Sequence, residues 1–197
     1  MKEWKSSYVV IPITDEIKKR AMEYVYIQFP DIDTKDYSYL EKKNIFMSEQ
    51  GLKEQQNLGN IAKICFEVYI NSVGFPEQRY VPVFKKASEF DFIINNKTIK
   101  VKEGHLKWPI DQMTSGYRPL LPEQQRDFQQ DYYINIQISP EMHEAYICGY
   151  LPMDIITSKD TTQDVNCINP HMDVYMSDLK PIEELVDILK GGIKRWL

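Results

Sequence analysis

The segment FDFIINNKTIKVKEG, residues 90–104, contains two short apolar runs separated by Asn95 and Asn96. Asparagine tolerates the left-handed backbone conformation that a two-residue hairpin turn demands. With both asparagines at the centre of the turn, the register of the hairpin is fixed and Asp91 faces Lys100. The segment therefore predicts an antiparallel hairpin that carries an acid and a lysine side by side.

Alternation of side chains divides this hairpin into two faces. The face expected to be buried carries Phe90, Phe92, Ile94, Ile99 and Val101. The other face carries Glu89, Asp91, Ile93, Thr98, Lys100 and Lys102. Opposite charges across a hairpin stabilise it by about 0.2–1 kcal/mol, so ordinary surface salt bridges are one interpretation. The apolar Ile93 among the charges favours another, in which some other part of the chain covers this face.

A long helix is expected before the hairpin, at about residues 49–73, with Gly74 as its stop. Its apolar stripe consists of Leu58, Ile61, Ala62, Cys65, Phe66, Tyr69 and Val73. Off the stripe lie Asn60, Lys63, Glu67 and Asn71. The helical spacing of the stripe predicts that this helix packs on the sheet to which the hairpin belongs.

Periodicity and turn residues place the remaining elements. Helices are expected at 14–29 and 180–197, a short bent strand at 79–84, strands at 131–139 and 144–152, and a helical turn at 153–157. The order of helices, then strands, then a helix predicts an α+β fold, α/β/α-like, with a central mixed sheet flanked by helices. At 197 residues, one domain over 1–197 is the default expectation.

Composition excludes several classes of protein. The hydrophobic fraction of 43% and the charged fraction of 27% are ordinary for a globular protein. The net charge of -5 argues against general polyanion binding but permits a local basic surface. No run approaches the ~20 apolar residues that span a bilayer, and the N-terminus lacks the apolar core of a signal peptide. A cytoplasmic protein without a membrane segment is expected.

Neither cysteines nor histidines form a recognisable metal motif. The scattered residues are Cys65, Cys148, Cys167, His105, His143 and His171. Their spacing fits no zinc or redox site, so buried thiols and structural or surface histidines are expected.

The order of a helix with Glu67, a strand with Asp91, a turn and a strand ending in Val101-Lys102 resembles the core of the PD-(D/E)XK nuclease superfamily, and in particular its restriction-endonuclease members. The resemblance covers about residues 49–157. It implies that Asp91 is the first acid and a Mg²⁺ ligand, that Glu67 is a supporting acid and second ligand, and that Lys102 is the catalytic lysine.

One position departs from the superfamily pattern: the second acid, two residues before Lys102, is Lys100. In such nucleases carboxylates hold Mg²⁺, which polarises the phosphate and activates water. An ammonium there removes a ligand and repels the metal by ~4 kcal/mol per unit charge at ~4 Å, for an effective dielectric of about 20. Glu103 points to the opposite face of its strand, whereas Glu89 and Glu67 could supply a substitute acid. Impaired or lost Mg²⁺ binding and cleavage is expected.

The resemblance therefore implies a restriction-type DNA endonuclease, acting on double-stranded DNA as a homodimer and impaired in this chain. Lys107, Arg118 and Arg126 lie in the long connection at 104–130 and are candidate DNA contacts. One alternative is a non-catalytic DNA-binding or interaction protein on the same fold. Another is an unrelated α+β protein with a salt-bridged hairpin, in which the predicted catalytic residues would not converge.

Overall fold

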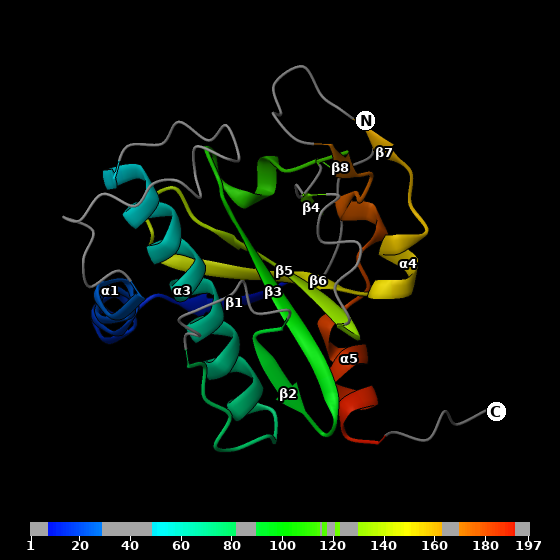
Figure 1. Ribbon diagram of the computed structural model, residues 1–197, viewed down its shortest axis with the longest axis horizontal. Helices are drawn as coiled ribbons and strands as arrows, with labels where there is room; N and C mark the ends of the chain where they lie inside the picture. The colour runs from blue at the N-terminus through cyan, green and yellow to red at the C-terminus, as the bar shows by residue number, and fades with distance from the viewer. Residues whose placement is uncertain are drawn as a thin grey trace.

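The computed structural model describes residues 8–28, 49–81, 90–114, 116–117, 121–122, 130–162 and 170–191. Its helices are α1 (Asp15–Gln28), α3 (Glu49–Ser72), α4 (Met153–Thr157) and α5 (Ile182–Leu189), with short 3₁₀ turns η1 (Ile110–Gln112) and η3 (Met176–Asp178). Its strands are β1 (Val9–Pro12), β2 (Phe92–Ile94), β3 (Lys97–His105), β4 (Leu121–Pro122), β5 (Tyr132–Ile138), β6 (Glu144–Pro152), β7 (Thr161–Thr162) and β8 (His171–Met172). Together they form an α+β fold (Figure 1).

A curled, mixed sheet of five strands runs in the order β1-β6-β5-β3-β2. Strand β3 pairs with β5 in parallel, and the other neighbours pair antiparallel. A second, three-stranded sheet has the order β4-β8-β7. The prediction of a mixed sheet with helices packed against it is confirmed.

The hairpin of β2 and β3 has the predicted register. Phe92 pairs with Ile99, and the turn residues Asn95 and Asn96 have φ values of 48° and 61°. The side chains that were expected to face the core are buried, except that Phe90 is only half-buried. The alternation of the hairpin and its asparagine turn were thus sufficient to define it.

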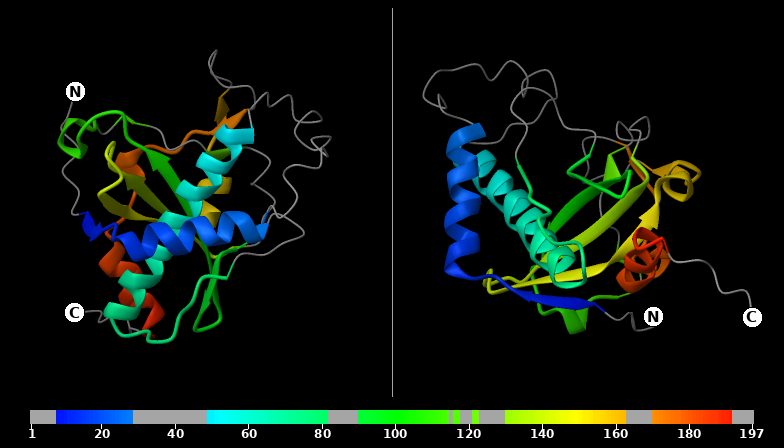
Figure 2. Two further views of the ribbon diagram at one scale, coloured as in Figure 1. Left: turned by 90° about the vertical axis from the view of Figure 1, so that its left-hand side faces the viewer. Right: turned by 90° about the horizontal axis from the view of Figure 1, so that it is seen from below.

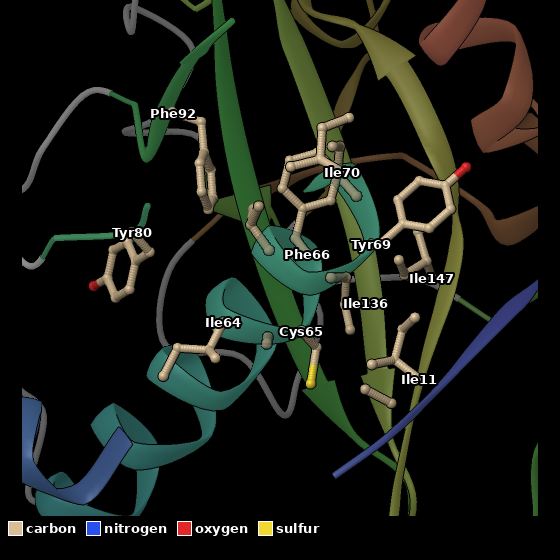
Figure 3. Close-up of a cluster of buried hydrophobic side chains, with 14 of the residues drawn as sticks. Ile11, Ile64, Cys65, Phe66, Tyr69, Ile70, Tyr80, Phe92, Ile136 and Ile147 are labelled. Carbon is tan, nitrogen blue, oxygen red and sulfur yellow. The ribbon is translucent and has the colours of Figure 1, made fainter. Parts of the chain in front are cut away.

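Helix α3 packs on the buried face of the hairpin and of β5. Phe66 meets Phe92 edge to face, with ring centroids 5.1 Å apart, and Ile136 and Ile147 of the central strands belong to the same buried cluster (Figure 3). Helix α5 contributes apolar side chains to the same core, as Ile182 and Leu185 do. The two helices therefore cover the same face of the sheet, with α1 lying across the outside of α3 (Figure 2).

The opposite face of the sheet is covered by the small sheet, α4 and the 3₁₀ turns. Tyr133 and Leu151 pack there against Leu121 and Met172 of the small sheet. Both sides of the central strands are thereby buried, and β6 is apolar along most of its length. In β5 the isoleucines that face the α3 side alternate with the buried polar residues Asn135 and Gln137.

The side of α3 that lies off its apolar stripe is also buried. Helix α1 covers it, and the buried Asn60 donates to the carbonyl of Ala21 at 3.2 Å. Glu67, which is 7% exposed, lies on this side as well. The stripe alone predicts one packed face for α3, whereas the helix has two.

The structure differs from the sequence prediction at two short strands. The expected strand at 79–84 is wrong over 79–81, because the N–H of Tyr80 bonds to the Glu67 side chain and not to a neighbouring strand; residues 82–84 lie outside the described part of the chain. Strand β1 was not predicted, since four residues ending in Pro12 carry little signal without their partner β6. In the described residues, no helix has the length and apolar character needed to cross a membrane.

Candidate active site

Asp91 lies immediately before β2, where it completes the ladder of the hairpin. Its N–H donates to the carbonyl of Ile99 at 2.7 Å, and its Oδ2 accepts the N–H of Val101 at 2.8 Å. The carboxylate thus takes the place of the backbone carbonyl that a longer β2 would offer to Val101 of β3. Its side chain is only 3% exposed, so the position of its charge is fixed by the sheet.

Two ammonium groups approach the other oxygen of Asp91. Lys100 Nζ lies 3.5 Å from Oδ1, and Lys63 Nζ lies 3.3 Å from the same atom. Lys63 comes from α3 on the core face of β3, whereas Lys100 projects from the opposite face. Asp91 can meet both because it lies at the edge of the strand, past the end of β2. The predicted proximity of Asp91 and Lys100 is confirmed.

The two lysines respond oppositely to this environment. Burial lowers the pKa of Lys100, and the charges of Lys63 and Lys102 lower it further, against the opposing effect of Asp91. Burial also acts to lower the pKa of Lys63, but the charges of Asp91, Tyr80 and Glu103 outweigh it, so this pKa is raised. Lys63 is therefore the firmly charged partner of Asp91.

Lys102 and Glu103 project from opposite faces of β3, as expected. Lys102 shares the face of Lys100 and lies beside Asn135 of β5 in the parallel register. Glu103 is on the α3 side, where its carboxylate lies 3.6 Å from the position that a Cβ on Gly59 would occupy. Its charge acts on Lys63 from there. The site therefore includes an acid on each side of Lys63.

Glu67 is engaged in a separate ion pair between α1 and α3. Both of its oxygens accept bonds of 2.6 Å from the guanidinium of Arg20, and Oε2 also accepts the N–H of Tyr80 at 2.6 Å. In this arrangement Glu67 holds two helices together. Its role as a supporting acid and metal ligand stays a prediction, one that requires Arg20 to release it.

The residues around Asp91 do not fit a Mg²⁺ ion as they are arranged. One oxygen of Asp91 faces two ammonium groups and the other accepts a backbone N–H. Hard divalent cations need several oxygen ligands, and cations at the same oxygen oppose them. Within the described ranges, no three His, Cys, Asp or Glu side chains come together as a metal site.

The predicted DNA contacts are only partly placed. Lys107 is exposed beside Trp108, which is 56% exposed. Arg118 and Arg126 lie outside the described residues, as does Glu89. The expected covering of this face of the hairpin is found at Lys100, whose side chain is 12% exposed, but not at Ile93, which is 54% exposed.

Sequence reasoning missed Lys63 as a member of the site. Its only signal was a lysine within the apolar stretch NIAKICF, residues 60–66. Nothing local ties it to Asp91, since the contact depends on how α3 lies across β3. The side chain is 14% exposed, which marks it as a buried charge only once the helix is in place.

No protein-family model, no curated protein and no solved structure matches this chain.

Proposed function

We propose that the chain is a duplex-DNA-binding protein of restriction-endonuclease type whose cleavage site is impaired. The observation that carries the proposal is the contact of Asp91 with Lys100, at the position where the superfamily pattern has a second acid. Along the chain, α3 is followed by the β2–β3 hairpin and then by β5 and β6, which is the order of elements in the superfamily core that the sequence resembles.

Lys102 supports a role in holding a phosphate. It is half-buried, and its side chain forms no ion pair or hydrogen bond with the described residues. An ammonium so placed is available to a phosphate oxygen, the commonest partner of lysine in protein–DNA complexes. Lys107 is exposed after the end of β3 and is a second candidate for a phosphate contact.

DNA binding is tested by fluorescence anisotropy on a mixed-sequence duplex. Affinity is expected at ~50 mM salt and should fall steeply with added salt, because phosphate contacts release counterions. Lys107→Ala should reduce the salt dependence by about one unit of slope. Lys159→Ala, which breaks an ion pair with Asp178, is the control and should leave the slope unchanged. Absence of duplex affinity at low salt contradicts the proposal.

Cleavage is tested by plasmid nicking in Mg²⁺ and in Mn²⁺. The unmodified chain should cut very poorly or not at all. Lys100→Glu restores the acid at the position that the superfamily pattern requires, so some cleavage is expected, and Asp91→Ala on that background should abolish it. Efficient cutting by the unmodified chain would show that Lys100 is not at the ligand position.

A second candidate is a non-catalytic DNA-binding or interaction protein on the same fold. It is favoured by the donors that occupy both oxygens of Asp91. This candidate predicts that Lys100→Glu stays inert while the variant remains folded and DNA-bound.

The restriction-type proposal includes a homodimer, because cutting both strands of a palindrome needs two copies of one site. Sedimentation equilibrium with and without a palindromic duplex tests this point. A monomer in both conditions contradicts it.

A further inference from the structure

Lys63 lies closer to Asp91 than Lys100 does, and it is not part of the superfamily motif. Its Nζ lies 3.3 Å from Asp91 Oδ1, compared with 3.5 Å for Lys100. It comes from a different element, so no change at position 100 removes it. The side chain is also held from a second direction, because its Nζ lies 5.1 Å from the centroid of the Tyr80 ring and 3.5 Å from the hydroxyl.

We propose that Lys63 is a resident counter-ion of Asp91 that weakens the binding of divalent cations at this site, independently of Lys100. The proposal rests on the proposed function in taking Asp91 as the first acid of the site. It goes beyond that function by assigning part of the weakened metal binding to a helix residue that the sequence pattern does not include.

The reason lies in the support around Lys63. An ammonium that swings into solvent can yield to a metal, but this one is nearly buried and held between a carboxylate and an aromatic ring. Lys63 is therefore held in place against Asp91 by its surroundings.

A direct consequence concerns Lys100→Glu. The new carboxylate would stand beside Asp91, with the Lys63 ammonium still at hydrogen-bonding distance from Asp91. Two carboxylates around one resident ammonium form an ion triad, in which the ammonium competes with any metal for the same oxygens. Full metal binding should require that Lys63 is removed as well.

The test is isothermal titration of Mn²⁺ into four proteins: the unmodified chain, Lys63→Met, Lys100→Glu, and the double variant. Mn²⁺ takes oxygen ligands and reports binding without any cleavage. No binding is expected for the first two, weak binding for Lys100→Glu, and binding at least about tenfold tighter for the double variant, because a like charge at contact distance has been removed. Lys159→Met with Lys100→Glu is the charge-matched control and should bind like Lys100→Glu alone.

Two results would overturn the inference. One is a double variant that binds Mn²⁺ no more tightly than Lys100→Glu. The other is Mn²⁺ binding by the unmodified chain that Asp91→Asn abolishes. Circular dichroism checks folding, and Lys63→Gln replaces Lys63→Met if the latter unfolds, since the amide retains a donor toward Tyr80. Duplex binding in EDTA is measured in parallel: its absence counts against the proposed function and leaves the Mn²⁺ comparison valid.

Discussion

Two buried carboxylates near α3, Glu67 and Asp91, are neutralised in different ways. Glu67 meets one guanidinium through two bonds of 2.6 Å, a bidentate geometry that matches one charge to one charge. Asp91 has two ammonium groups at a single oxygen, at 3.3 and 3.5 Å. The first arrangement is typical of a structural ion pair. The second brings two like charges close together. Structural ion pairs usually avoid such crowding, whereas functional sites often contain it.

Tyr80 links the two regions. Its N–H donates to Glu67, and its hydroxyl donates to the carbonyl oxygen of the Asn60 side chain at 3.1 Å while lying 3.5 Å from Lys63 Nζ. The structural pair therefore positions the residue against which Lys63 packs. Substitution of Glu67 tests the structural ion pair, and substitution of Asp91 tests the site.

The largest effect is expected from Asp91→Asn. The amide leaves two buried ammonium groups without their shared counter-charge, and removal of one member of a buried pair costs about 3–5 kcal/mol. Urea denaturation measures the free energy of unfolding. In a metal site made mainly of crowded acids, loss of one negative charge would instead raise the free energy of unfolding. Unchanged or increased stability would therefore contradict the arrangement described here.

A smaller loss, about 2–3 kcal/mol, is expected from Glu67→Gln. Arg20 is 24% exposed and keeps part of its hydration, and glutamine still offers an oxygen to the N–H of Tyr80. Chemical denaturation again gives the value. A loss as large as that of Asp91→Asn would mean that the two carboxylates are equally critical.

Arg20→Lys should cost less still, about 1–2 kcal/mol, because a lysine cannot make the paired bonds of a guanidinium. The charge is retained, so this variant isolates the geometry of the pair. Thermal unfolding followed by circular dichroism is adequate for the comparison. A neutral effect would show that this ion pair acts through its charge and not through its paired geometry.

The smallest effect is a pH dependence that involves Lys100. Its pKa in the folded protein is below the ordinary 10.5, so between these two values the unfolded chain binds more protons and stability rises with pH. Lys63, whose pKa is raised, contributes stability that is fully present below 10.5 and is lost progressively as the pH rises from 10.5 to its folded pKa, so it adds no slope between pH 7 and 10. Lys100→Met should therefore remove a rise in unfolding free energy as pH approaches 10.5 from below, measured by urea titrations from pH 7 to 10. The same slope in both proteins would contradict the assignment.

Local signals in the sequence were sufficient for the hairpin and its neighbours. The Asn95-Asn96 turn and the alternation around it fixed the pairing of Phe92 with Ile99, because register in a two-residue hairpin depends only on adjacent residues. The strand predicted at 144–152 from its alternation and the turn before it coincides with β6. The restriction-endonuclease resemblance and the DNA substrate stay predictions.

The tertiary structure alone decided which charges meet. Lys63 and Asp91 are far apart in sequence, and only the position of α3 across β3 brings the ammonium to 3.3 Å from the carboxylate. The packing of α1 on α3 likewise brings Glu67 into its ion pair with Arg20. A sequence determines which residues can form an element because that chemistry is local, whereas ion-pair partners depend on the distance between elements, which is set only when their apolar faces pack together.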